Sequence, residues 1–502
     1  MTSRARACRV VAVILVSLAL ANASARAGEP VPAPGSEPTT AELLRRIEAL
    51  EKEVAELRGA GRAPEDRNTH GSAAPAQARR IQGAGGHDES AAAPAVEAPA
   101  VAKATGGTAK PTAGYDDGFF VSSGDGAYKL RINGYVQADG RFFADSDIRK
   151  NVDQFVIRRA RLDLRAKLWK RYIVRIAPDF AGSDLSLKYA YIETDFSDAF
   201  MLRVGKYKTP FGIEQLESST ALPFAERALP DNIVPGRDIG VELFGDPTGG
   251  RLSYTIAVLN GVPDGGNGDG DVNDAVDIAA RLFATPYAPS PYSPLRGAGF
   301  GIAGTWGREQ GSTSSPQLPS YKTSGRTTFF SYEDDGTKAG TTIADGDRWR
   351  ISPQASWYEG PFGLLTEYVR SSQRLSRDGD KATVDNQAWQ IRTSWILTGE
   401  RASPERVDPA YPFDFGGGHW GAWQLALRWS SLDVDAAAFR SGFADPSKSA
   451  RHADAIAAAI NWYLNHNVSV YLDYEHTMFG GGDGSGDRVD EDLFLTRMQL
   501  EF

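Results

Sequence analysis

The chain has 502 residues, a formal net charge of −9 and a single cysteine, Cys8. The acidic balance argues against a nucleic-acid-binding protein with a globally basic surface. One cysteine excludes a disulfide framework and cysteine-based zinc sites. No apolar run is long enough for a transmembrane helix. The composition leaves two classes, namely several ordinary soluble domains or one large β-barrel.

The first 27 residues have the features of a secretory signal peptide. Arg4, Arg6 and Arg9 precede an apolar stretch at 10–20, and a small-x-small site follows at 25–27. This order of charge, apolar segment and cleavage site predicts that residues 1–27 are a signal peptide that is removed.

Residues 28–59 and 60–118 differ in composition from the rest of the chain. The first range combines a Pro-rich segment with a short helix, in which apolar residues recur at alternating spacings of four and three: Leu43, Ile47, Leu50, Val54 and Leu57. That spacing predicts a short coiled coil. The second range is rich in Ala, Gly and Pro and poor in large apolar residues. We expect it to be a disordered linker.

A strict alternation of charged and apolar residues runs from Arg159 to Leu168. A period of two indicates a β-strand, because successive side chains point to opposite faces. In a soluble sheet the charged face would meet bulk water. In a membrane β-barrel the apolar face would meet lipid, and the charged face would line a water-filled lumen. Phe155 and Ile157 have the parity of Arg159, so we expect a β-bulge near Arg158.

Strand patterns repeat from about residue 130 to the C-terminus. Sixteen candidates begin near 130, 153, 171, 186, 200, 238, 251, 276, 297, 346, 361, 385, 419, 453, 467 and 490. An even number is typical of a single-chain bacterial barrel, and a last strand ending in Phe502 fits this class. A further short candidate at 327–332 is assigned to a loop. The sequence thus predicts an all-β fold, a 16-stranded antiparallel transmembrane barrel over 119–502.

Connections should alternate between long outer loops and tight turns. Long ones are predicted at 209–237, 261–275, 308–345, 434–452 and 478–489, while 286–296 and 399–418 do not follow the alternation.

Several local motifs resemble the phosphate- and polyphosphate-selective porins (porin O and P). They are 158–161 (RRAR), 203–212 (RVGKYKTPFG), 235–241 (PGRDIGV), 280–286 (ARLFATP) and 360–365 (GPFGLL), together with the terminal Phe502. The resemblance covers roughly 115–502. It implies a homotrimer in the outer membrane of a Gram-negative bacterium, with the N-terminal extension in the periplasm and a third outer loop folded inward as a constriction.

Alternation places a set of cations toward the lumen. The predicted pore-lining, anion-binding residues are Arg131, Arg141, Arg159, Arg161, Arg165, Lys167, Arg203, Lys206, Lys208, Arg281, Arg348 and Arg350. The parity at 202–208 is ambiguous, so either Arg203 or the two lysines face inward. Guanidinium groups suit phosphate and carboxylate oxygens, and a row of weak sites allows an ion to be passed on.

The predicted constriction loop is acidic. It carries Glu214, Glu217, Glu226 and Asp231 against one cation, Arg227, and has no lysine. This opposes the cationic lining, so two functions stay open. One is an anion-preferring channel for phosphate or similar small anions, and the other is a general diffusion porin without phosphate specificity.

An enzyme or an adhesive barrel is less favoured. No H-E-x-x-H or G-x-S-x-G motif occurs, and the six histidines are scattered. We therefore expect no catalytic residues, metal or cofactor, and the expected partners are small anions, outer-membrane lipid and further copies of the chain.

Overall fold

The computed structural model describes residues 110–144, 151–270, 273–288 and 293–502. The predicted signal peptide, the coiled coil and most of the linker lie outside these residues. The linker prediction is wrong at its C-terminal end, because strand β1 (Thr112–Tyr115) lies before the predicted boundary at 118 and pairs with β2 (Phe119–Ser122). Strand structure therefore begins earlier than the composition indicated.

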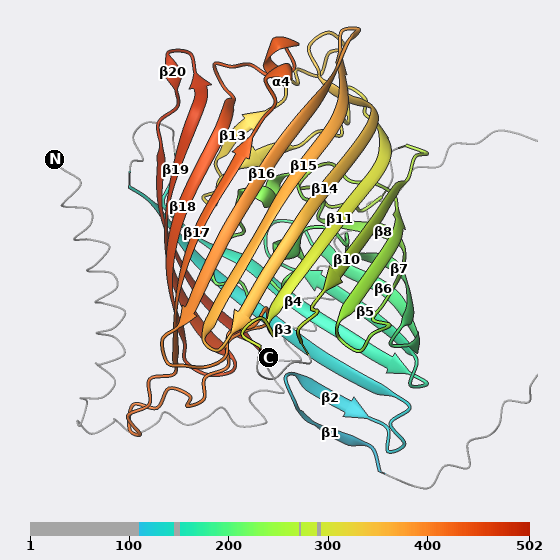
Figure 1. Cartoon of the computed structure of the whole chain (residues 1–502), viewed down its shortest axis with the longest axis vertical. Helices are drawn as coiled ribbons and strands as arrows, with labels where there is room; N and C mark the ends of the chain where they lie inside the picture. Colours follow the sequence, from blue (N-terminus) through green and yellow to red (C-terminus); the bar gives the residue numbers. More distant parts are fainter. Residues whose placement is uncertain (1–109, 145–150, 271–272, 289–292) are drawn as a thin grey trace, which may run out of the picture. The chain divides into compact units, whose positions relative to one another are not determined.

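Sixteen long strands of the described region form one antiparallel sheet that closes on itself (Figure 1). They are β3 (Lys129–Phe143), β4 (Gln154–Leu168), β5 (Tyr172–Asp179), β6 (Ser186–Ser197), β7 (Phe200–Lys208), β8 (Arg237–Gly245), β9 (Leu252–Leu259), β10 (Asp277–Ala284), β11 (Ala298–Gln310), β14 (Ile343–Glu359), β15 (Phe362–Arg377), β16 (Asp380–Ile396), β17 (Ala422–Asp433), β18 (Ala450–Tyr463), β19 (Val468–Asp483) and β21 (Glu491–Glu501). Neighbours in sequence are neighbours in the sheet, and β21 pairs with β3 to close the barrel. The predicted 16-stranded barrel is confirmed.

The alternation of side chains along each strand explains why this sheet closes around a polar interior. In β17, Leu425, Leu427 and Trp429 are exposed on the outer face, whereas Arg428 and Ser430 are buried. Outward apolar and inward polar residues are the pattern of a barrel in lipid. None of the helices that the structure describes is long and apolar enough to cross a membrane.

The two ends of the barrel differ in the length of their connections. One end, here the loop end, carries the connections at 209–236, 260–276, 311–342 and 434–449. The other, the turn end, carries short turns such as 169–171, 198–199 and 360–361, as well as Phe502. The two predicted exceptions are confirmed as long turn-end connections at 285–297 and 397–421. At the loop end, β15 and β16 are joined by only two residues, 378–379, which the strict alternation would not give.

Folded loops occupy part of the loop end. The connection 311–342 contains the hairpin of β12 (Ser320–Lys322) and β13 (Thr328–Ser331), which confirms the loop assignment of 327–332. Tyr321, Phe329 and Phe330 are buried there and pack in one cluster with Phe443, just after helix α4 (Ala436–Arg440). A short strand, β20 (Gly486–Asp487), pairs with the end of β19.

The predicted bulge near Arg158 is present. Gln137 pairs with Arg159, but the next residue, Ala138, pairs with Ile157, so Arg158 has no partner on β3. Beyond this step Phe155 and Ile157 point outward, 77% and 54% exposed. A bulge turns consecutive side chains toward one side of a strand. It allows both Arg158 and Arg159 to reach the interior.

Candidate functional site: the barrel interior

The connection 209–236, here the inner loop, crosses the lumen and binds the far wall. It contains helix α3 (Ile213–Leu216) and the 3-10 turn η1 (Leu229–Asn232). Its backbone groups bind side chains of five strands, through the contacts Ile213 N to Glu367, Ser219 O to Gln137, Thr220 O to Gln499, Pro223 O to Asn461 and Ala225 N to Asp473. Polar backbone in a confined space needs such partners. The lumen wall therefore supplies the hydrogen bonds that hold the inner loop across it.

Glu226 is the most heavily paired acid of the inner loop. Arg158 donates to it through Nε and, at 3.0 Å, through Nη2. The guanidinium groups of Arg141, Arg159 and Arg497 lie 3.5, 3.9 and 4.0 Å from its carboxylate. Burial alone would raise the pKa of Glu226, but attraction to Arg158 and Arg159 outweighs it and holds that pKa well below the usual range. The carboxylate is therefore ionised and neutralised by the wall.

Two further glutamates bind a single arginine of β16. Arg392 donates to Glu214 at 3.1 Å and to Glu217 at 2.8 Å. The pKa of Glu214 is lowered, because Arg392 and Arg428 outweigh the effect of burial. The pKa of Glu217 is raised, because burial is the larger effect there. The acids that made the inner loop look repulsive to anions are thus engaged with arginines of the far wall.

The remaining charged pair of the inner loop is internal. Arg227 donates to the carbonyl oxygens of Glu214 and Glu217, and its Nε lies 3.9 Å from Asp231. Burial raises the pKa of Asp231. The loop cation therefore stabilises its own backbone and lies beside the Asp231 carboxylate.

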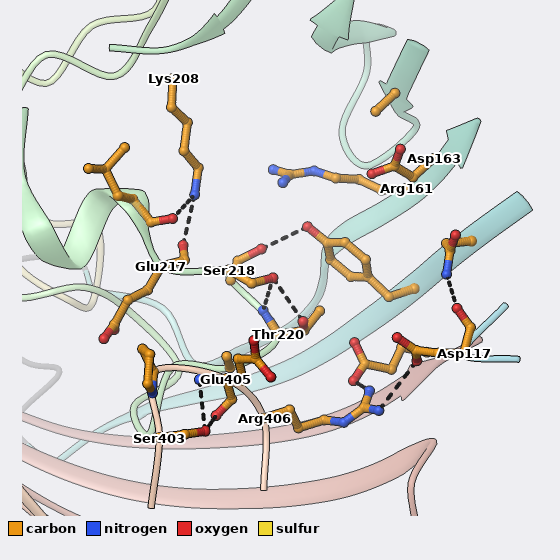
Figure 2. Close-up of a pocket in the computed structure, with 18 of the residues that line it drawn as sticks. Asp117, Arg161, Asp163, Lys208, Glu217, Ser218, Thr220, Ser403, Glu405 and Arg406 are labelled. Carbon is orange, nitrogen blue, oxygen red and sulfur yellow. Dashed lines mark hydrogen bonds and ion pairs between the residues drawn. The ribbon is translucent and has the colours of Figure 1, made fainter. Parts of the chain in front are cut away.

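A cavity of about 1130 Å³ lies between the inner loop and the turn end. Figure 2 shows that Lys208, Arg161 and Arg406, from three distant parts of the chain, surround the same space. Carboxylates also line it, and several are paired: Asp163 with Arg175, and Glu501 with Arg406. The lining carries charges of both signs. The sign of the electrostatic potential in the cavity therefore depends on the charged side chains that lack a counter-ion.

Two cavity-lining cations at the root of the inner loop have no carboxylate partner among the described residues. Lys208 donates to the carbonyl oxygens of Leu216 and Glu217, at 3.1 and 2.7 Å. Arg237 donates to the hydroxyl of Tyr189, and its buried Nε has no hydrogen-bond partner there. We call Lys208, Arg237 and Tyr189 the loop-root cluster.

The loop-root cluster is compact and electropositive. The guanidinium groups of Arg175 and Arg237 lie 3.9 and 4.8 Å from the ring centre of Tyr189. The positive charges of Arg227 and Arg161 are close enough to Lys208 to repel its ammonium group. Like charges held together in a low-dielectric wall focus a positive potential into the adjoining water. An anion entering the cavity would meet donors that no protein carboxylate already occupies.

Several residues predicted to line the pore are instead buried in ion pairs. Arg348 binds Asp277 and Glu309 at 2.8 and 2.6 Å, and Arg350 binds Asp264 at 2.6 Å. Both arginines are at most 2% exposed. Alternation identifies the inward face of a strand, but it does not show that loops cover that face.

The ladder on β4 is divided in the same way. Arg159 is 4% exposed and donates to Gln137, and on the neighbouring strand β3 Arg141 lies beside Glu226. Arg161 lines the cavity but binds Asp179 at 2.8 Å. Arg165 lines the cavity and is exposed, and no ion pair engages it or Lys167 in the described part of the chain. The accessible positive charge is therefore in the turn-end half of the ladder.

Two other residues predicted to line the pore also reach the cavity, Arg131 from β3 and Arg281 from β10. Arg131 binds Asp116 at 3.0 Å, and Arg281 donates to Gln354 rather than to a carboxylate.

Side chains of both parities reach the interior at 202–208. Gly205 has φ of +128°, and a Cβ there would lie 2.2 Å from the carbonyl oxygen of Ala190. Arg203 binds Glu193 and Glu242 on neighbouring strands, Lys208 lines the cavity, and Lys206 pairs with Asp269 of the 260–276 connection. Arg203 and Lys208 thus share the interior, contrary to the either-or expectation.

Sequence reasoning missed Arg158, Arg175 and Arg237 as interior cations. The sequence did predict a bulge near Arg158, and Arg237 lies in the 235–241 motif. Neither residue was assigned to the interior, because neither position follows the simple alternation of a strand. No group of three or more His, Asp or Glu residues in the described ranges has the arrangement of a metal site.

Comparison with known proteins agrees with this architecture. The family of phosphate-selective porin O and P matches residues 130–502. The chain belongs to this family. It is 23% identical over 425 residues to Porin O of Pseudomonas aeruginosa, covering 77% of this chain and 91% of that protein. Because the family consists of outer-membrane channels, the predictions of a porin and of a non-enzymatic barrel are confirmed.

Solved porin structures are similar at low identity. The outer-membrane channel DcaP of Acinetobacter baumannii is 11% identical with a TM-score of 0.48, covering 75% of this chain and 98% of that one. An anion-selective porin from Comamonas acidovorans is 11% identical with a TM-score of 0.44, covering 75% and 100%. Both scores lie below 0.5, so the assignment of this porin rests on the family match.

Replacing Glu226 by Gln should destabilise the protein by about 3–5 kcal/mol, because it leaves buried arginines without their counter-charge. Guanidinium titration of the refolded protein in detergent measures this loss. Glu217→Gln is the matched control in the same loop. Its loss should be smaller, because burial already favours the neutral form and Arg392 keeps Glu214. Equal losses would contradict the central role of Glu226.

The contribution of Glu226 should also depend on pH in a defined direction. Its folded pKa lies below the ordinary value of 4.5, so its stabilisation is complete above that value and is lost as the pH falls through the folded pKa. The difference in unfolding free energy between the native protein and Glu226→Gln should stay constant from about pH 8 to about pH 5. A difference that changes within that window would mean that the pKa of Glu226 is raised, and a difference that does not decrease as the pH is lowered below about 4.5 would mean that its pKa is ordinary.

Proposed function

We propose that this porin is a channel that prefers anions and admits phosphate or similar small anions. The observation that carries the proposal is the loop-root cluster, where Lys208 and Arg237 face the cavity without a carboxylate partner in the described region. A guanidinium and an ammonium beside a phenol hydroxyl offer several donors to tetrahedral oxygens. The family and the relative Porin O support the same solute class.

The pairing of the loop acids also supports anion preference. Glu214, Glu217 and Glu226 each bind wall arginines, so little of their negative field reaches a passing ion. Four guanidinium groups surround two carboxylates here, those of Glu226 and Asp139. Arg497 binds Asp139 at 2.7 and 2.8 Å. The local balance is therefore positive on the loop-end side as well.

We further propose that the chain sits in the outer membrane with its loop end outside and its turn end, with the N-terminal extension, in the periplasm. Long external loops and short periplasmic turns are the rule for such barrels.

The outer surface supports a homotrimer. Eight of the ten tryptophans lie in strands β11 to β18, and β3 to β10 contain none. Strands β5, β9 and β10 have eight residues each, against 16 or 17 in β14 to β16. Eight residues at about 3.3 Å each, tilted by roughly 40°, span about 20 Å, less than the apolar band of about 25 Å. The tryptophan at the edge of this low wall is Trp169, in the turn between β4 and β5. A wall this low, whose strands carry no tryptophan, fits a contact between copies better than a contact with lipid.

Exposed apolar side chains mark the loop end of this low wall. Phe155, Phe180 and Leu185 are 77%, 57% and 67% exposed. An interface there would cover them, and the predicted coiled coil at 28–59 would then hold three chains in parallel.

Reversal potentials across a KCl gradient in planar bilayers should show anion preference, and phosphate should block the chloride current. Lys208→Gln and Arg237→Gln should each raise the half-blocking phosphate concentration roughly tenfold, because each removes a charged hydrogen bond worth about 1.5 kcal/mol. Arg237→Lys should restore part of the block.

Arg308→Gln is the control for this measurement, because Arg308 is exposed and paired with Asp347 at the loop end. Cation preference would overturn the proposal. Anion preference without phosphate block in the native protein would leave a general diffusion porin.

Phe155→Lys should convert trimers to single chains in detergent, because it places a charge in the proposed interface. Mass photometry measures the change, and a version that also lacks residues 28–59 removes any tether from the coiled coil. Ile456→Lys is the matched control on β18, 49% exposed on the tryptophan-bearing arc. Loss of trimers in the control but not in Phe155→Lys would place the interface on the other arc.

A further inference from the structure

The connection 397–421 is a long segment at an end of the barrel where turns are short. Its first half packs inward, since Ala402 and Val407 are 5% and 6% exposed and cluster with Ile396, Tyr463 and Tyr471. Its second half does the opposite. Figure 1 shows the connection extending past the ends of β16 and β17.

The second half is a small hairpin, residues 411–420, which we call the aromatic hairpin. Asp414 and His419 exchange two backbone hydrogen bonds of 3.0 Å, and Gly418 has φ of +73°, as a tight reversal needs. Tyr411, Phe415 and Trp420 are 66%, 69% and 58% exposed. A defined backbone therefore presents large aromatic side chains outward.

The aromatic hairpin continues the lipid-facing surface of the barrel. The ring of Phe413 lies 5.2 Å from Trp462 and 5.9 Å from Trp420, and Trp462 donates to the Trp420 carbonyl oxygen at 2.7 Å. Trp462 in turn stacks on Trp423 at 5.3 Å. Trp423 and Trp462 stand at the turn ends of outward-facing rows on β17 and β18. One uninterrupted aromatic surface thus runs from the barrel wall onto the hairpin.

The charge of the aromatic hairpin matches the same environment. Asp414 is the one Asp, Glu, Lys or Arg among residues 410–421, and its carboxylate accepts a hydrogen bond from the backbone of Gly416. The inward half carries Arg401, Glu405, Arg406 and Asp408. Aromatic rings with a polar edge favour the headgroup region of a bilayer, and charged side chains avoid the hydrocarbon just beneath it.

We propose that the aromatic hairpin inserts into the headgroup region of the phospholipid leaflet at the turn end, as an anchor beside the barrel wall. The occupant is phospholipid, because the surface is continuous with the wall that lipid already covers. The proposal rests on the membrane location of the barrel and not on its solute, so it stands or fails independently of anion transport.

Site-directed spin labelling of the full chain in phospholipid vesicles tests this, with Cys8→Ser as background. Labels at Phe415→Cys and Tyr411→Cys probe the aromatic hairpin. Leu427→Cys is the lipid reference, 61% exposed on the outer face of β17, and Glu405→Cys is the water reference on the inward half. The measured quantity is the collision rate with oxygen relative to that with a water-soluble nickel complex.

The labels on the aromatic hairpin should show an oxygen preference severalfold above that of position 405 and below that of position 427, because the headgroup region lies between water and the bilayer interior. A ratio equal to that of position 405 would overturn the proposal. So would low collision rates with both reagents, which would mean that protein covers the hairpin. Water exposure that soluble peptidoglycan fragments abolish would assign the hairpin to a glycan instead.

Discussion

The neutralisation of Glu226 by wall arginines is the interaction on which the interior depends. An inner loop with four acids could not lie across a barrel lined by arginines unless each charge found its partner, because an isolated buried charge costs several kcal/mol. Arg158 supplies a partner to Glu226, and Arg392 and Arg428 supply partners to Glu214, from three strands. The same pairs that stabilise the loop remove its negative field, so stability and anion preference have one physical origin.

The pairing of charges across the barrel explains what the sequence could and could not predict. Strand positions followed from the period of two, because only one parity can face lipid. The bulge at Arg158 followed as well, because Phe155 and Arg159 could not otherwise lie on opposite faces. Charge pairing did not follow, because Glu226 and Arg497 are far apart in sequence and meet only when the barrel closes. The prediction thus identified the acidic residues of the inner loop correctly, but it did not include the arginines that neutralise them.

The predicted cationic ladder shows the same limit. Alternation correctly placed Arg348 and Arg350 inside, but the connection 260–276 supplies Asp264 to Arg350, and Asp277 at the start of β10 binds Arg348. Arg237, which reaches the cavity, lies at the first residue of β8, where no periodic signal exists. The charges open to a solute are therefore set by what loops leave uncovered, which a one-dimensional pattern does not contain.

The position of Glu226 has a consequence for the order of folding. Its partners Arg141 and Arg158 lie on the first two barrel strands, and Arg497 lies on the last. Because β21 pairs with β3, Glu226 spans the seam where the two ends of the sheet meet. Its full set of contacts can form only after the final strand has docked. The inner loop then bridges that seam from inside the lumen, and the closing of the barrel and the seating of the loop become one step.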